Sequence, residues 1–540
     1  MPVWRSLAWL AVAICLGFAY AVALTAPAVG VFHDDGVYLV TAKALATGRG
    51  YNIVSLPRAT PETKYPILFP ALLAVVWKIY PSFPANVFWL KCVPLLAGLV
   101  WLGLSLYLLW RETGSSPVAR TLILLAALSP WMLFLSTALL SETVFAAFTT
   151  AAIIAIERAC AGGRRAGMLV ISAAVLASGA FLTRTAGVAV IAAGGAMLCS
   201  RAGVKKTALY LFVCSALCAP WLAWQSAQRP AAAGVSAFDT VKNYETWNVI
   251  GGFTWRQKPV IVGVNLASFL LAPGILMGFP ATHAGAAAAM GFGLLALIGL
   301  ACRLRTPWGG LEWLVVVYGG MLLLWAWPPT RFLAPLLPAM LLYAYRGARG
   351  ACRWARLSEH SAACVLGALA LLLAVQSGWA ITRSVREVAA HGRVGIPNLD
   401  LDDWNETGRL LAWLRDRTPA GAVVMGNIDP IVYLFTGRHA LRGFRQDPYL
   451  LHYTSDPAAR PLGDAPEWME SAAGQGADYV VCTPDAFFKE APYLRRLYAE
   501  VMTSAPALLT LVYTGADPRY RVYAVDRTAG VRRLQAESAR

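Results

Sequence analysis

Charged residues are scarce in this chain. They make up 14% of its 540 residues, whereas a soluble globular protein carries roughly 25%. Hydrophobic residues make up 58% of the chain, which is more than a single soluble core would hide from water. The composition therefore excludes a soluble globular protein and predicts a polytopic α-helical membrane protein.

Several site motifs are also missing. The ten cysteines include no Cys-x-x-Cys pair and no histidine lies near two of them, which excludes a zinc site or a disulfide framework of the usual spacing. No glycine-rich loop for a nucleotide phosphate occurs. The net charge of +17 comes without a basic stripe or a binding motif, so we expect no nucleic-acid partner.

Long apolar segments predict about eleven transmembrane helices. We expect them at 6–28, 88–110, 118–137, 140–157, 167–183, 186–200, 207–226, 286–302, 309–327, 332–346 and 361–381. Every second loop between them is basic. Because basic loops stay in the cytoplasm, we expect the N-terminus inside the cell, in a multi-pass protein of the inner cell membrane.

One apolar segment, 260–280, does not fit this alternation. It is long enough to span, but a span there would move every later basic loop to the outside. We therefore interpret it as an interfacial or re-entrant helix on the outer side.

Two segments are predicted to lie outside the bilayer on the outer face. The first outer loop, 29–87, carries helical patterns at 37–47 and 66–80, which we expect to lie along the membrane surface. The tail, 383–540, alternates strand-like and helix-like segments, with strands expected at 422–427, 477–483, 508–515 and 520–526. This alternation predicts a periplasmic α/β domain that follows a membrane domain of residues 1–382.

Two adjacent acids, Asp34 and Asp35, follow the first apolar segment. One carboxylate is enough to cap the helix that comes next, because it meets unpaired N–H groups. Two adjacent carboxylates repel each other, and an ionisable residue at a membrane boundary is by default a hypothesis of function. The residues alone leave both readings open.

The order of several short motifs resembles the GT-C superfamily of membrane glycosyltransferases. It is most similar to the branch that holds the ArnT-like aminoarabinose transferases, the protein O-mannosyltransferases and the RgtA/B/C/D-like enzymes. The motifs are His33-Asp34-Asp35-Gly36-Val37-Tyr38, Lys64-Tyr65-Pro66, Ser141-Glu142, Leu182-Thr183-Arg184 and Thr330-Arg331-Phe332-Leu333-Ala334-Pro335. Tyr65 departs from the pattern, since many members have proline there.

The resemblance implies an integral-membrane, inverting glycosyltransferase. Such an enzyme moves a sugar from a polyprenyl-phosphate donor to a hydroxyl or amine of a lipid, polysaccharide or protein acceptor on the outer face. It implies that Asp34 is the base that takes the acceptor proton, and that Asp35 orients the acceptor or helps to bind a metal. The phosphate would be bound by cationic side chains: Lys64, Arg331 and Arg184.

For three of the implied roles, an alternative remains open. Glu142, together with Tyr38, would position the acceptor or a cation, but Glu142 could equally cap its own helix. Arg331 and Arg184 could be interfacial anchors instead of phosphate ligands. A divalent metal is a candidate cofactor, with oxygen ligands from Asp34, Asp35 and Glu142, but family members differ in metal need.

Two other functions compete with this one. A transporter or flippase of a lipid-linked glycan would also have many spans, but it usually places its ionisable residues near the midplane of repeated halves, and no repeat is visible here. An O-antigen polymerase or ligase would concentrate its chemistry in a large late outer loop. The position of the acid pair in the first outer loop favours the glycosyltransferase.

Overall fold

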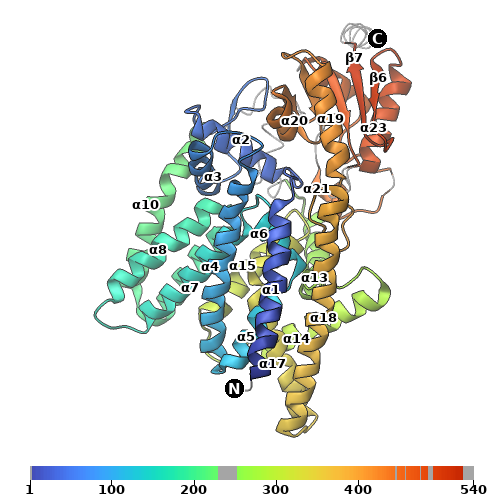
Figure 1. Cartoon of the computed structure of the whole chain (residues 1–540). Helices are drawn as coiled ribbons and strands as arrows, with labels where there is room; N and C mark the ends of the chain where they lie inside the picture. The colour runs from blue at the N-terminus through green and yellow to red at the C-terminus, as the bar shows by residue number, and fades with distance from the viewer. Residues whose placement is uncertain are drawn as a thin grey trace.

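The computed structural model describes residues 3–228, 252–443, 447–456, 458–474, 476–484 and 491–526. A bundle of long helices carries a sheet domain at one end, and the N-terminus lies at the other end (Figure 1). Eight of the described helices are long and apolar enough to cross a membrane: α4 (Val87–Thr113), α7 (Glu142–Cys160), α8 (Ala166–Thr183), η1 with α9 (Thr185–Gly187 and Val188–Ala202), α10 (Val204–Gln228), α13 (Gln257–Leu276), α14 (His283–Leu304) and α18 (Glu359–His391). The chain is a multi-pass membrane protein.

The other predicted spans are α1, shorter helices and one broken helix. They are α1 (Val3–Thr25), α15 (Gly310–Leu323), the run of α16, η2 and α17 (Thr330–Leu333, Ala334–Leu336 and Leu337–Trp354), and the pair α5 and α6 (Ser116–Ala127 and Pro130–Thr137). The α5–α6 pair is bent by 64°. Pro130 has no N–H to continue α5, and Ser129 Oγ accepts from Met132 N at 3.2 Å to start α6.

The ambiguous segment 260–280 forms α13. Asn265 in its middle donates to the carbonyls of Leu322, Leu323 and Trp325 at 3.0–3.2 Å, and accepts from Tyr453 OH in the tail at 3.0 Å. α13 has the length and composition of a span. Its interfacial or re-entrant course therefore stays a prediction, and so does the side of the membrane assigned to each loop.

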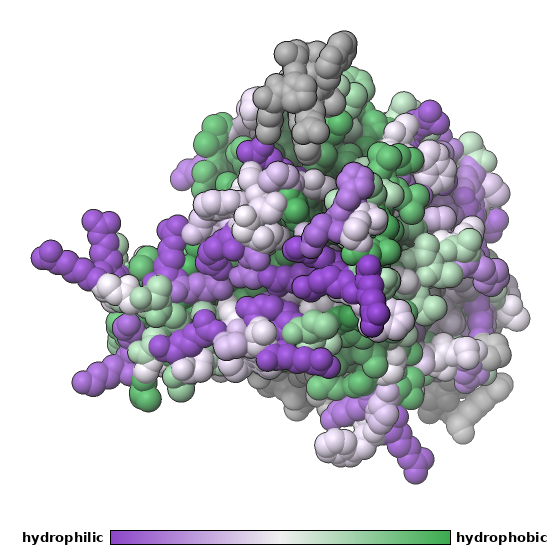
Figure 2. Space-filling model, turned by 90° about the horizontal axis from the view of Figure 1, so that it is seen from below, coloured by the Kyte–Doolittle hydropathy of each residue, from purple (hydrophilic) through white to green (hydrophobic). Residues whose placement is uncertain are grey.

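The basic helix ends gather on one face. Seen from the end opposite the sheet, hydrophilic side chains run in a belt across the molecule (Figure 2). Arg111, Arg201 and Arg303, near the ends of α4, α9 and α14, line one open cleft of about 380 Å³ there. The basic loops, which the sequence predicts on the cytoplasmic side, thus lie on one face of the molecule. They must do so if they share one side of the membrane.

The first loop forms α2 (Asp34–Ala46), a short hairpin of β1 (Asn52–Ile53) and β2 (Thr60–Pro61), and α3 (Leu68–Ile79). Both predicted helices are present, and Gly48 takes a φ of +73° just after the first, as expected for the end of a helix. α2 is more enclosed than predicted, because nine of its 13 residues are buried. It packs against α3 and against α20 (Asp429–Thr436) of the tail. Its position along the membrane surface stays a prediction.

The tail is an α/β domain with a five-stranded sheet. The strand order is β4-β3-β5-β7-β6, in which β4, β3 and β5 are parallel to one another and β7 is antiparallel to both of its neighbours, β5 and β6. Its elements are α19 (Trp404–Arg417), β3 (Val423–Gly426), α20, β4 (His439–Leu441), α21 (Pro448–His452), α22 (Ala465–Gly474), β5 (Tyr479–Cys482), α23 (Ala491–Ser504), β6 (Leu509–Thr514) and β7 (Arg521–Val525). The sequence predicted four of these strands: β3, β5, β6 and β7. It missed β4, because a strand of three residues is too short to show alternating hydrophobicity.

The tail and the first loop share one hydrophobic core. It joins Val37 and Phe69 of the loop to Leu410 and Val480 of the tail. Ala440 N also donates to Ser55 O across the junction at 2.8 Å. The predicted boundary at 382/383 falls inside α18, which runs without a break from the bundle to the tail. The acid pair, Asp34 and Asp35, thus lies between the first loop, the helix bundle and the tail.

Candidate active site

A cavity of about 570 Å³ lies where the first loop, the adjoining ends of the bundle helices and the tail meet. Among the described residues that line it, Asp34 is the one carboxylate, and the cations are Lys64, Arg184, Arg331 and Arg442. Leu271, Ile275 and Ala289 of α13 and α14 line another part. The cavity therefore offers a cationic surface beside an apolar one.

Asp34 begins α2 and projects into this cavity. Tyr65 OH donates to its Oδ1, and Arg331 Nη2 donates to its Oδ2 at 2.9 Å. Burial would raise the pKa of Asp34, but the charges of Arg331 and Lys64 and the hydrogen bond from Tyr65 hold the pKa well below its usual value. Asp34 is thus an anion at neutral pH with both oxygens occupied by donors.

Arg331 connects Asp34 to a second, deeper carboxylate. Its Nε donates to Glu142 Oε1, and Arg184 Nη1 lies 2.8 Å from the same oxygen. Arg331 is 7% exposed and Glu142 is 2% exposed. An anchoring arginine extends its side chain to the membrane–water interface, whereas the Arg331 guanidinium is buried and paired with carboxylates. The geometry therefore favours a role in the site over a role as an interfacial anchor.

Tyr38 and Arg184 meet at Ser141, the residue before α7. Tyr38 OH lies 3.2 Å from Ser141 Oγ, and Arg184 Nη1 donates to the same oxygen at 3.0 Å. The Tyr38 ring also packs edge-on against the Tyr65 ring, with 5.0 Å between centroids. The structure therefore brings together Asp34, Tyr38, Glu142, Arg184 and Arg331 from four separate segments.

Lys64 completes the cationic side. Its Nζ lies 4.8 Å from the centroid of the Tyr65 ring and 5.7 Å from that of Trp327. Burial lowers the pKa of Lys64, although the carboxylates of Asp34 and Glu62 oppose this. Glu62 fixes the backbone here, because one of its oxygens accepts from Lys64 N at 2.5 Å and Tyr65 N at 3.0 Å.

Asp35 points away from the cavity. Its two oxygens accept from the backbone N–H groups of Gly30, Val31 and Phe32 at 2.6–3.0 Å, and its side chain is buried. Burial, with a contribution from the charge of Asp34, raises the pKa of Asp35 to about 6 against the opposing effect of these N–H groups. Asp35 holds the turn that leads into α2, so the two adjacent acids have different surroundings.

The three acids considered as metal ligands do not converge. Arg331 lies between Asp34 and Glu142, and Asp35 faces the backbone. Among the residues that the structure describes, no three His, Cys, Asp or Glu side chains form a group that could hold a metal ion. The donor set as arranged does not fit a divalent cation, and we derive no step through one.

Several residues of the cavity lining were not predicted from the sequence, among them two tryptophans, an arginine and a histidine. Trp325 and Trp327 stand just before the Thr330-Arg331 motif, and their proximity to it was the available signal. Arg442 and His452 come from the tail, at the end of β4 and in α21. No sequence signal marks Arg442 or His452, because only the packing of the tail on the first loop brings them here.

No protein-family model matches the chain, and no curated protein matches it in sequence. Solved structures share its architecture, among them the following three. Two are ArnT from Cupriavidus metallidurans: the apo state (TM-score 0.53, 13% identity, 97% of this chain and 99% of that one) and the form bound to undecaprenyl phosphate (0.54, 13%, 95% and 97%). The third is the Archaeoglobus fulgidus oligosaccharyltransferase in complex with zinc and sulfate (0.53, 14%, 95% and 73%). This chain therefore shares the fold of ArnT and of the Archaeoglobus fulgidus oligosaccharyltransferase.

Proposed function

We propose that this protein is an inverting glycosyltransferase that moves a sugar from a polyprenyl-phosphate donor to a hydroxyl or amine acceptor. The observation that carries the proposal is the composition of the 570 Å³ cavity. A single carboxylate, Asp34, faces it among the described lining residues, beside four cationic side chains and an apolar helix surface. A base, an anion site and a lipid-compatible wall are the three parts that this reaction requires.

The acceptor oxygen or nitrogen attacks the anomeric carbon as the bond from that carbon to the phosphate oxygen breaks. The acceptor proton passes to Asp34, a contribution worth roughly 10²–10⁴ in rate. The leaving polyprenyl phosphate gains negative charge, which Lys64 and Arg331 are placed to stabilise. Attack opposite the leaving group inverts the anomeric configuration.

Arg331 also affects how readily Asp34 accepts a proton. While its guanidinium donates to Asp34, it stabilises the carboxylate as an anion and weakens it as a proton acceptor. A donor phosphate competes for the same guanidinium. Binding of the donor would then release one oxygen of Asp34 as the acceptor arrives.

The structural likeness supports the class of donor. ArnT, whose structure covers nearly this whole chain, has been seen with undecaprenyl phosphate. The positive-inside pattern supports an inner-membrane location with the cavity on the periplasmic face, where a lipid-linked sugar is presented. Lipid A or lipopolysaccharide, other polysaccharides and proteins are the acceptor classes of the proposal.

The test is transfer activity of the full chain reconstituted in liposomes. Labelled polyprenyl-phosphate sugars and envelope acceptors would be offered to the native chain, Asp34→Asn and Asp35→Asn. We expect Asp34→Asn to lose at least about 100-fold in kcat with correct insertion, and Asp35→Asn to act mainly through stability. Undiminished turnover by Asp34→Asn would refute Asp34 as the base. Movement of labelled lipid across the bilayer without any transfer would instead indicate a flippase.

A further inference from the structure

The turn that presents the proposed base has an unusual backbone conformation. His33, the residue directly before Asp34, has a φ of +59° and a ψ of −46°. A residue that carries a side chain rarely adopts a positive φ, and such a conformation persists only where the surrounding structure holds it. The direction of Asp34 therefore depends on the contacts that hold His33 in place.

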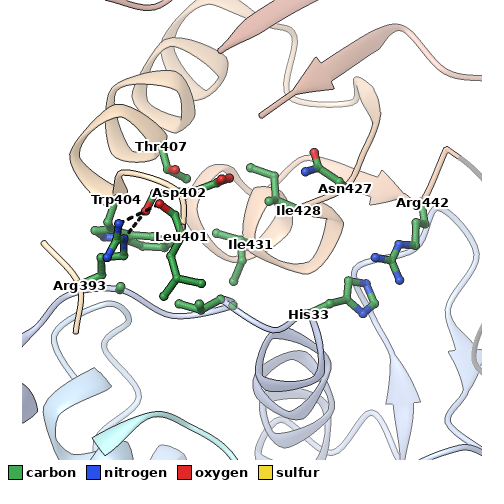
Figure 3. A pocket seen from close by; sticks show the side chains of 13 residues that line it. His33, Arg393, Leu401, Asp402, Trp404, Thr407, Asn427, Ile428, Ile431 and Arg442 are labelled. Atoms are coloured by element: carbon green, nitrogen blue, oxygen red, sulfur yellow. Dashed lines mark hydrogen bonds between the residues drawn. The ribbon is translucent and has the colours of Figure 1, made fainter. Parts of the chain in front are cut away.

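The tail holds the side chain of His33. Its Nε2 lies 2.9 Å from Oδ1 of Asp429, the first residue of α20, and both side chains are buried. Burial lowers the pKa of the His33 ring, so the ring is neutral at pH 7 and donates from Nε2 to the carboxylate. Figure 3 shows this junction from close by, with Ile431 and Arg442 of the tail beside the loop that carries His33.

The first turn of α20 also packs against the backbone before and after Asp34. Gly30 has a φ of +73°, and a side chain at this position would overlap Ile431. A Cβ atom at Gly36 would lie 3.0 Å from Cβ of Pro430, which is closer than side-chain carbons normally approach. The two glycines therefore allow α20 to lie directly against the turn that presents Asp34.

The carboxylate of Asp34 is held by other parts of the chain. Arg331 of α16 and Tyr65 of the first loop donate to its two oxygens. The tail thus fixes the backbone of Asp34, while the bundle and the first loop fix its carboxylate. A base must lie within hydrogen-bond reach of the proton that it takes, and a displacement of about 1 Å can lower the rate about 100-fold.

From these contacts we infer that Asp429 is a positioning residue, which through His33 sets the direction in which Asp34 points into the cavity. Asp429 is not among the described residues that line the cavity, so it acts on the base through His33. The inference rests on the proposed function and gives the tail a part in the chemical step. A contact that merely joined the tail to the first loop would affect stability and leave the rate of the folded protein unchanged.

The first experiment compares Asp429→Ala with the native full chain in liposomes. We expect kcat to fall about 30-fold while the KM for the polyprenyl-phosphate sugar stays within about twofold, because the cations that face the donor lie on other elements. Asp429→Asn keeps an oxygen for His33 Nε2, so its kcat should fall less, about fivefold. This milder variant also serves as the test if Asp429→Ala fails to fold.

Two comparisons separate positioning from a loss of stability. Val522→Ala removes buried side-chain atoms from β7, which β3 and β5 separate from β4, the strand that contacts the first loop. It should lower the melting temperature and leave kcat within about twofold. His33→Ala alone and combined with Asp429→Ala should give the same kcat within about twofold, because the second substitution has no contact left to remove. Additive losses of kcat, or an equal loss in Val522→Ala, would overturn the inference.

A cryo-EM structure of Asp429→Ala in nanodiscs, with a bound antibody fragment, tests the inference without transfer. We expect the φ of His33 to become negative and Asp34 Oδ2 to move beyond hydrogen-bond distance of Arg331 Nη2. An unchanged turn would overturn the inference even if the native chain is a transferase. A displaced turn in a chain that consumes no polyprenyl-phosphate sugar would keep the control of Asp34 by the tail and remove the proposed function.

Discussion

Arg331 Nη2 lies 2.9 Å from Asp34 Oδ2, although 297 positions separate the two residues in the chain. The same guanidinium donates to Glu142 and lies 4.7 Å from the centroid of the Phe32 ring. One side chain thus ties the first loop to α7 and α16.

Arg331→Lys should lower transfer about 100-fold, mainly through a higher KM for the donor. Lysine keeps the positive charge, but its ammonium is a compact point charge and does not reproduce a planar fork that reaches two carboxylates. The measurement is kcat and KM for the donor in liposomes. Arg349→Lys, an exposed position in α17, is the control. Near-native donor KM in Arg331→Lys would contradict a phosphate role.

Tyr65→Phe should move the acid limb of the pH–rate profile to higher pH. The proposed base works as the carboxylate, and the hydroxyl of Tyr65 is one cause of its lowered pKa. Removal of that donor raises the pKa of Asp34, so activity is lost at a less acidic pH as the pH falls. The measurement is kcat/KM against pH.

Tyr38→Phe is the matched control for this profile. Tyr38 packs on the Tyr65 ring, but its hydroxyl lies against Ser141 Oγ and not against Asp34. Its acid limb should stay where the native one lies. Equal shifts in both variants would point to a general packing effect instead of a bond to the base.

Stability of the purified protein should increase as the pH falls from about 7 toward 5. Burial raises the pKa of Glu62 to about 7 and that of Asp35 to about 6 in the folded state. A group whose pKa is raised on folding takes up a proton, so the folded state gains as the pH falls from the folded pKa toward the unfolded one, by up to about 1.4 kcal/mol per pH unit and group. Burial lowers the pKa of His33 below 6.5, so this one group opposes the increase as the pH falls below that value. Asp34, whose pKa is lowered, contributes in the same opposing direction only at more acidic pH.

Glu62→Gln tests this assignment. The amide keeps an oxygen for the N–H groups of Lys64 and Tyr65 but cannot take up the proton. We expect a flatter dependence of the melting temperature on pH between 5 and 7 in detergent, with the part due to Asp35 retained. A dependence as steep as in the native chain would assign the titration to another group.

His33→Ala and Asp429→Asn should each lower stability by about 1–3 kcal/mol, and the double variant by little more than either one. The two side chains form one buried contact of 2.9 Å between the first loop and the tail. The measurement is a double-mutant cycle of thermal unfolding, with Arg415→Gln on the exposed side of α19 as control. Additive losses would mean that the pair does not couple the two parts.

The sequence predicted the class of the protein and the segments that carry its site. Apolar runs of about 20 residues, basic alternate loops and a tail of alternating strands and helices are local patterns, and each is readable without knowing any distant contact. The short motifs around Asp34, Lys64, Glu142, Arg184 and Arg331 identified five side chains that the fold brings to one region. The sequence missed β4, because a strand of three residues shows no pattern, and it did not reveal how far α2 is buried, because the partners of α2 are distant in the chain.

The sequence could not predict that the carboxylates of Asp34 and Asp35 have different surroundings. Adjacent residues at the start of a helix point in different directions, so one carboxylate enters the cavity while the other binds the turn of residues 30–32. Arg442 reaches the cavity only because the tail shares a core with the first loop. Hydropathy and charge depend on neighbours along the chain and can be read from it, whereas the pairing of ions and the shape of a pocket depend on neighbours in space, which packing alone decides.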